Sequence, residues 1–191
     1  ASGVFASIAN MHNVPRYRLD SGNDPYALCR KEGYSDTEYR ACYNQMNSMV
    51  MLMSDSSFEH ALGYTNTIAP LKYRAEAVSG IAVIYLQDLK QHDRSLDPNA
   101  TLSACTALPN ALAPACISGL IGGIVEFGAP GKQYETMLAL CEAESHTTET
   151  RRLCYEHLQT AAKNTYASPL LKSICARIPP ERQTDDCTTD H

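Results

Sequence analysis

Eight cysteines, evenly spaced in pairs, constrain the fold of this chain more than any other feature of its sequence. The numbers of residues between the two members of each pair are 12, 10, 12 and 11, for Cys29 and Cys42, Cys105 and Cys116, Cys141 and Cys154, and Cys175 and Cys187. No pair has the C-x2-C spacing of a zinc ribbon or of a c-type haem attachment site. The pattern predicts four local disulfides and an oxidising compartment, periplasmic or extracellular. Free buried thiols are the alternative.

The residues at the middle of each pair are typical of helix starts. Between Cys29 and Cys42, Ser35 and Glu38 have the spacing of a capping box. The stretch SHTTE (145–149) is also cap-like, and PNALAP (109–114) and PPERQ (179–183) place proline where a first helical turn accepts it. Each pair is therefore predicted to bracket a helix–turn–helix, with each bridge contributing about 3 kcal/mol in the chain-entropy model.

A repeat underlies the cysteine pairs. The segment AVSGIAVIYL (77–86) matches CISGLIGGIV (116–125) almost position by position, so that Ala77 takes the place of the second cysteine in a unit without a bridge. Anchors at 42, 77, 116, 154 and 187 give five units of about 36 residues, a period typical of helical repeats. We predict an all-α fold, an α-solenoid of about five helix pairs over residues 25–191. Residues 1–24 lack the repeat and are predicted to form an extended or weakly ordered N-terminal arm.

The unit YETMLALCEAESHTTETRRLCYEHLQTAA (134–162) carries a resemblance to a known class of proteins. It resembles the tetratricopeptide-like and Sel1-like helical repeats, in particular the cysteine-rich secreted proteins in which a disulfide joins each helix pair. The resemblance implies protein–protein binding or assembly rather than catalysis.

Several function classes have no support in the sequence. Sixteen basic and 21 acidic residues, without long runs of one sign, give a net charge of −5, which argues against nucleic-acid binding. The longest apolar stretch (117–125) is too short to span a membrane. The six histidines are scattered, and no catalytic or cofactor-binding motif is present, so we predict a non-enzyme without metal or cofactor. The sequon Asn99-Ala100-Thr101 follows Asp97-Pro98, which favours a helix start there over a glycosylation site.

The methionine-rich stretch CYNQMNSMVMLM (42–53) has three possible roles: core packing, a docking surface, or a copper site. In the repeat alignment, Met46 and Met49 occupy positions where other units have apolar or small residues, so the stretch is predicted to be the second helix of the first unit, with both side chains in the core. Met51 is expected to face away from the bridge.

The predicted function is an exported interaction or structural subunit that binds a protein partner or assembles with itself. The candidate interaction residues are mostly aromatic or apolar: Phe5, Ile8, Tyr39, Tyr43, Met51, Tyr73 and Tyr85. The N-terminal arm is a candidate for docking on a neighbouring subunit. The chain begins Ala-Ser-Gly, as exported proteins do after signal removal, and a trimmed chain would begin in the same way. The alternatives are a periplasmic copper-handling protein that uses the methionines with Met11-His12, and an enzyme with a groove active site.

Overall fold

The computed structural model describes residues 24–30 and 32–188 of the 191-residue chain, and over those residues it is helical, without a strand. The all-α class predicted from the sequence is thus confirmed for this part of the chain. The elements, in order, are η2 (Ala27–Arg30), α2 (Asp36–Gln45), α3 (Asn47–Met53), α4 (Phe58–Tyr64), η3 (Thr65–Thr67), α5 (Leu71–Gln91), α6 (Pro98–Thr106), α7 (Ala113–Phe127), α8 (Gln133–Glu142), α9 (Thr148–Thr165), α10 (Ser168–Cys175), η4 (Pro180–Arg182) and α11 (Asp185–Thr188).

Local side-chain caps determine where several helices begin. Ser35 and Glu38 form the predicted capping box at α2, in which Glu38 accepts the Ser35 backbone N–H at 2.8 Å. Thr147 caps α9 by accepting the Thr150 backbone N–H at 3.1 Å. Asp97 caps α6 by accepting two backbone N–H groups, so the Asn99 sequon lies in a helix start, as expected.

Four disulfides join the cysteines that their spacing pairs. They connect η2 to α2, α6 to α7, α8 to α9 and α10 to α11, with Cα–Cα distances of 5.6, 5.7, 5.4 and 5.5 Å. These distances fall within the range that a disulfide requires. Four intrachain disulfides are characteristic of proteins from an oxidising compartment outside the cytosol.

The first unit differs from the predicted helix–turn–helix. Cys29 lies in a short 3-10 helix rather than an α-helix, because Pro25 and the left-handed Gly33 (φ 88°) leave room for little more than one turn. The stretch 42–53 is also divided into two helices, with the break at Met46. The buried Asn47 side chain donates to the Asn44 carbonyl at 2.7 Å and so competes with the helical ladder.

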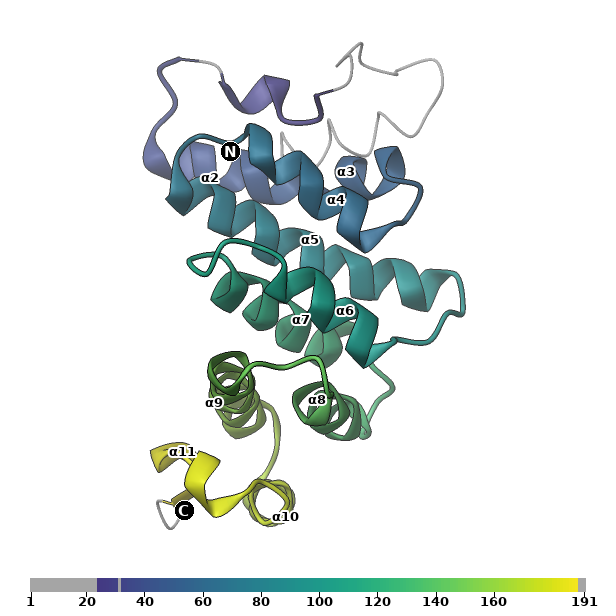
Figure 1. The fold of residues 1–191 in the computed structure, drawn as a ribbon, viewed down its shortest axis with the longest axis vertical. Helices are drawn as coiled ribbons and strands as arrows, with labels where there is room; N and C mark the ends of the chain where they lie inside the picture. Colours follow the sequence, from purple (N-terminus) through teal and green to yellow (C-terminus); the bar gives the residue numbers. More distant parts are fainter. Residues whose placement is uncertain (1–23, 31, 189–191) are drawn as a thin grey trace.

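The helix pairs follow one another in chain order along the long axis of the molecule (Figure 1). Helix α5 packs against α2, α3 and α4 on one side and against α7 on the other, and α7 packs in turn against α9. The first helices of successive pairs also meet, α4 with α6 and α6 with α8. None of the helices in the described ranges combines the length and the apolar content needed to cross a bilayer.

Glycines allow successive second helices to approach closely. An added Cβ on Gly119 of α7 would lie 2.2 Å from the Ser79 carbonyl oxygen of α5, and one on Gly123 would lie 3.1 Å from the Val83 Cα. Gly80 in α5 makes room for Asn47 in the same way, since a Cβ there would lie 1.9 Å from the Asn47 Nδ2. Ser79-Gly80 and Ser118-Gly119 are the repeated SG pair of the sequence alignment, so the repeat encodes this close approach.

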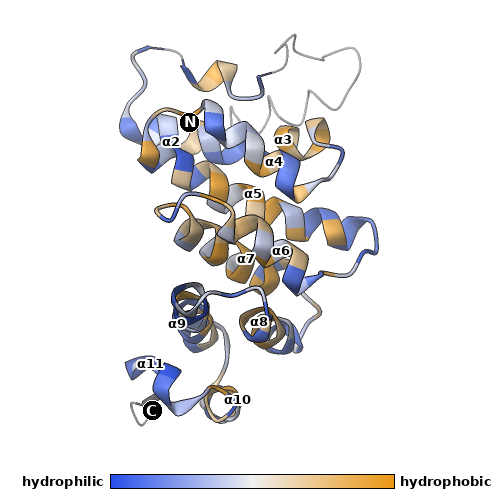
Figure 2. Ribbon diagram, viewed as in Figure 1, coloured by the Kyte–Doolittle hydropathy of each residue, from blue (hydrophilic) through white to orange (hydrophobic). Residues whose placement is uncertain are grey.

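One continuous hydrophobic core runs through the pairs from Tyr26 to Ile178. In Figure 2 apolar residues are dense along α7, which lies in the middle of the stack, whereas α9 carries a hydrophilic face. Ala77, which replaces the cysteine in the unbridged unit, is fully buried in this core.

Substitution of Gly119 and of Gly122, both in α7, should have opposite effects on stability. In Gly119→Ala the new methyl group meets the α5 backbone, so we expect the free energy of unfolding to fall by about 1–2 kcal/mol despite the better helix propensity of alanine. Gly122→Ala is the matched control. No atom lies within 4 Å of its added Cβ, and we expect a gain of about 0.5–1 kcal/mol. Denaturant unfolding with the disulfides intact measures the free energy of unfolding of both variants. Equal changes in the two would contradict the close contact of Gly119 with the α5 backbone.

Removal of one disulfide should lower the free energy of unfolding by about the amount expected from the length of the loop that it closes. For Cys141→Ala with Cys154→Ala, whose sequence separation is 13, we expect a loss of about 3 kcal/mol in unfolding free energy. Peptide mapping of the wild-type chain under non-reducing conditions checks the pairing first. Recovery of Cys29 linked to a residue other than Cys42 would be inconsistent with the fold.

Candidate functional site

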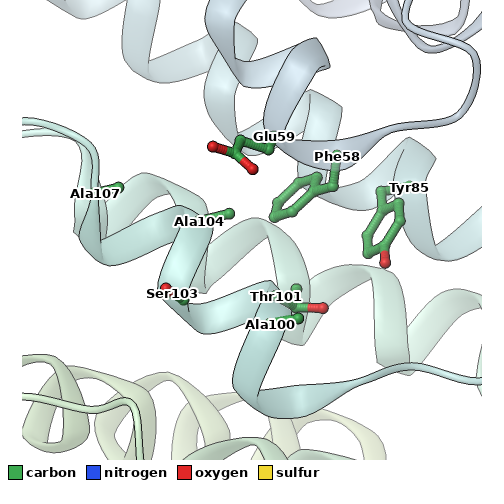
Figure 3. A pocket seen from close by; sticks show the side chains of 8 residues that line it. All are labelled: Phe58, Glu59, Tyr85, Ala100, Thr101, Ser103, Ala104 and Ala107. Carbon is green, nitrogen blue, oxygen red and sulfur yellow. The ribbon is translucent and has the colours of Figure 1, made fainter.

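An open groove of about 360 Å³ lies where α4, α5 and α6 meet (Figure 3). Eight residues line it: Phe58, Glu59, Tyr85, Ala100, Thr101, Ser103, Ala104 and Ala107. We refer to it as the α4–α6 groove. It is formed by the first helices of two successive pairs, with α5 closing one side.

Two stacked aromatic rings form one wall of the groove. The Phe58 and Tyr85 ring centroids are 4.5 Å apart, and the ring planes differ by 17°. Ser57 caps α4 by accepting the His60 backbone N–H, which fixes Phe58 as the first residue of that helix. Phe58 is buried and Tyr85 is half-buried, so the pair presents an apolar surface that is partly accessible.

Small side chains of α6 form the floor. Ala100, Ala104 and Ala107 are spaced by four and three residues, so they lie on one face of the helix. The opposite face is fixed, because Leu102 and Cys105 are fully buried and Cys105 is bonded to Cys116 in α7. The floor is therefore flat, apolar and held rigidly by a disulfide.

Two polar groups lie on opposite sides of the groove. Figure 3 shows the Glu59 carboxylate above Ala104 and Ala107, and the Thr101 hydroxyl on the side nearer Tyr85. Glu59 is exposed and takes part in no ion pair within residues 24–30 and 32–188. Among the described residues that line the groove, it is the only charged one.

The Thr101 side chain is 2% exposed, and its Oγ1 has no hydrogen-bond partner in the described structure. Two other buried side-chain atoms in the described structure also lack a hydrogen-bond partner, the Nε of Arg74 and the Nε of Arg151. Each of these guanidinium groups, however, makes a hydrogen bond through another nitrogen. Thr101 alone among the three has an entirely unpaired side chain. A buried hydroxyl in this state costs about 1–3 kcal/mol.

The predicted interaction residues are distributed unevenly. Tyr85 lines the α4–α6 groove. Tyr43 and Tyr73 are buried, so their predicted role as surface anchors is wrong for this structure. Met51 is 3% exposed, so its side chain lies in the core of the described structure. Phe5 and Ile8 lie outside the described residues.

Tyrosine rings instead form a ladder of contacts that joins Tyr26, just before η2, to α2 and α5. Centroid separations are 5.6 Å for Tyr26–Tyr43, 5.6 Å for Tyr43–Tyr73 and 5.1 Å for Tyr39–Tyr73. Burial raises the pKa of Tyr26, whose hydroxyl donates to the Asn47 Oδ1 at 3.0 Å. These rings act as packing between the first two units, and Tyr39 is half-buried in the same ladder.

An exposed ion-pair network covers the end of this ladder. Asp36 binds Lys72, Arg40 and the Tyr73 hydroxyl, and these hydrogen bonds, that from Lys72 first, lower the pKa of its carboxyl group. Arg40 also pairs with Glu76. Because all these groups are near the surface, the network contributes little to stability beyond fixing the α2–α5 register.

Most methionine side chains of the stretch 42–53 pack in the hydrophobic core. Met46 and Met49 are fully buried, as the repeat alignment predicts, and only Met53 of the four is partly accessible. Within the described residues, no group of three or more His, Cys, Asp and Glu side chains is placed to hold a metal ion.

The half-buried histidines serve local structure. His146 lies within 2.9 Å of the Leu140 carbonyl oxygen and 3.3 Å of the Thr150 hydroxyl, and desolvation lowers its pKa. Desolvation also lowers the pKa of His157. Both are therefore neutral near pH 7 and hold no excess positive charge.

A second groove of about 450 Å³ lies between the α6–α7 connection and the start of α9. Glu149 is the one charged residue among the described residues that line it, and hydrogen bonds from Arg152 lower the pKa of that carboxyl group. Neither groove brings together an acid, a base and a nucleophile. Of the two, the α4–α6 groove has the better binding chemistry, with an aromatic wall, a floor of small side chains, the exposed Glu59 carboxylate, and a Thr101 hydroxyl that has no hydrogen-bond partner among the described residues.

No family model, no curated protein and no solved structure matches the chain.

The sequence contained a partial signal for the groove. Ala100, Ala104 and Ala107 form a visible small-residue face, but nothing local indicates that Phe58 and Tyr85 lie opposite it. The three elements come from two different units, so their meeting depends on how the pairs stack. In the sequence, Thr101 stands out only as the third residue of the sequon, and no sequence feature indicates that its side chain is buried beside the groove.

Replacement of Thr101 by valine should stabilise the chain. Valine has nearly the same shape and removes the unpaired hydroxyl, so we expect the free energy of unfolding to rise by about 1 kcal/mol. Thr101→Ser keeps the hydroxyl and loses a buried methyl group, and should lower it by about 1 kcal/mol. Thermal unfolding measures both variants. Destabilisation by valine would mean that the hydroxyl has a partner in solution.

Proposed function

We propose that this protein is an exported, disulfide-stapled α-solenoid that acts as a non-catalytic interaction or structural subunit. The observation that carries the proposal is the open α4–α6 groove between the first helices of successive pairs. In helical-repeat proteins such surfaces between repeats are where extended or helical segments of partners bind.

The packing order supports the solenoid interpretation. Helices α5, α7 and α9 contact one another in sequence, as do α4, α6 and α8, so each pair meets mainly its neighbours. The repeated SG pairs and the bridge positions follow the same period of about 36 residues. The proposed kinship is with tetratricopeptide-like and Sel1-like repeats, and it is one of architecture.

The lining of the α4–α6 groove supports binding over catalysis. Enzyme sites usually gather several titratable groups with perturbed pKa values in one pocket. Of the described residues that line the groove, Glu59 alone carries a carboxylate, and the others are aromatic, small or hydroxylic. This composition suits a peptide side chain better than a reacting substrate.

Burial of the methionines weighs against a copper-handling role. A carrier needs thioethers that an ion can approach, and Met46, Met49 and Met51 are sealed in the core. Their flexible side chains instead fill the irregular space that the break at Met46 creates.

A photocrosslinking amino acid in the groove tests the proposed function. Placed at Ala107, which is exposed and lines the groove, it should give one discrete adduct, either with a partner protein or with a second copy. The matched control position is Glu126, exposed on α7 and outside the groove lining, where we expect no such adduct. The chain is purified in non-reducing conditions from the cells that make it, and adducts are identified by mass spectrometry.

Sedimentation analysis of the same material gives the second readout. A complex or an oligomer that dissociates when Ala107 is replaced by tryptophan would agree with the groove as the contact. A strictly monomeric chain that gives no adduct at Ala107 would overturn the proposal.

A further inference from the structure

The start of helix α6 makes no use of two side chains in the sequon Asn99-Ala100-Thr101. The helix begins at Pro98, and its cap is Asp97, whose carboxylate accepts two backbone N–H groups of the first turn. The expected helix start is therefore explained by the two residues before the sequon, and it leaves the side chains of Asn99 and Thr101 without a reason. Asn99 is also the one asparagine of the sequence with a serine or threonine two positions later.

The Asn99 side chain is held in an orientation that leaves its amide nitrogen without a partner. Its Oδ1 accepts the backbone N–H groups of Glu144 and Ser145, at 2.9 and 3.4 Å, in the connection between α8 and α9. Two donors on one side require the amide oxygen there, so Nδ2 points the other way. Asn99 is exposed, and its Nδ2 makes no hydrogen bond in the described part of the chain. This nitrogen is the atom to which an N-linked glycan is attached.

The Thr101 hydroxyl makes no polar contact in the folded structure. The side chain is buried, and its Oγ1 has no hydrogen-bond partner among the described residues. Valine would fill the same space without the cost of an unpaired hydroxyl. A sequon, by contrast, requires serine or threonine at its third position. Since Thr101 is inaccessible once α6 has packed, its hydroxyl is available to a modifying enzyme only before the chain folds.

We propose that Asn99 is a site of N-linked glycosylation, modified by an oligosaccharyl transferase of the secretory pathway before α6 packs. The co-reactant is an oligosaccharide linked to a lipid diphosphate. The Asn99 Nδ2 forms a bond to the anomeric carbon of the first sugar, and the bond between that carbon and the diphosphate oxygen breaks. Nδ2 loses one proton to a base of the transferase, and the lipid diphosphate leaves. Oδ1 remains an acceptor, so the modified side chain keeps its contacts with the α8–α9 connection.

The attachment point lies beside the α4–α6 groove and outside its lining. Ala100 and Ser103 line the groove, whereas Asn99 does not. A glycan on Asn99 therefore leaves the lining residues unmodified. The inference goes beyond the proposed binding role and shares with it only the export that the four disulfides indicate.

The full chain, purified from the cells that make it, is tested by mass spectrometry before and after treatment with peptide-N-glycosidase F. We expect an intact mass above that of the polypeptide, and complete loss of the excess on treatment. The glycosidase leaves an aspartate at the attachment site, so peptide mapping in heavy-oxygen water should locate the change at Asn99.

Three variants expressed in the same cells separate the sequon from its surroundings. Thr101→Ser keeps the sequon and should keep the mass excess. Thr101→Val should lose the excess completely while remaining folded, because valine fits the same buried space. The matched control Asn110→Gln changes another exposed asparagine, which is not part of a sequon, and should leave the excess unchanged.

Three results would each overturn the inference: a chain of unmodified mass, an excess that the glycosidase leaves in place, and an excess that Thr101→Val retains. None of them bears on the groove, which the probe at Ala107 tests separately. A chain without a glycan that still gives the Ala107 adduct would therefore end this inference and leave the proposed function standing.

Discussion

The local disulfide is the interaction on which the rest of the structure depends. The first helices of the pairs are short, from the four residues of η2 to the ten of α8, and helices of this length are unstable by themselves in water. Except in the α4–α5 pair, a bridge joins the first helix of each pair to the second, with Cα–Cα distances between 5.4 and 5.7 Å. Stapled pairs then present defined faces to one another, and the continuous core forms where those faces meet.

The second unit shows how the fold manages without a bridge. Its second helix, α5, is the longest in the described chain at 21 residues, and it packs on both sides. The α5 backbone meets Gly119 of α7 on one side, and Gly80 of α5 admits the Asn47 side chain on the other, so α5 fits closely against both neighbours without a disulfide. Helix α4 has no covalent link to α5 and is held by Phe58, Ala61 and Leu62 in the core. The α4–α6 groove borders this unlinked helix.

What the sequence could predict was local in origin. The four pairings depend on cysteines 11 to 13 positions apart, and the capping box depends on Ser35 and Glu38 alone. The burial of Met46 could be predicted from the alignment of repeats, because the equivalent positions of other units hold apolar residues. Met51 could not be placed in this way, because Asn47 breaks the helix and is itself held by Tyr26, 21 residues away. The groove was not predictable for the same reason, since Phe58, Tyr85 and Ala104 meet only when two units stack.

Thr101 connects the stability of the chain to its candidate site. The rest of α6 is optimised for its position, with an Asp97 cap, a proline in the first turn and a disulfide on the buried face. Valine at position 101 would fit the same space without an unpaired hydroxyl, so stability alone does not account for threonine there. In the described structure the hydroxyl therefore carries a free-energy cost that the packing of α6 does not offset. Residue 101 thus connects the stability of α6 with the groove that this helix lines.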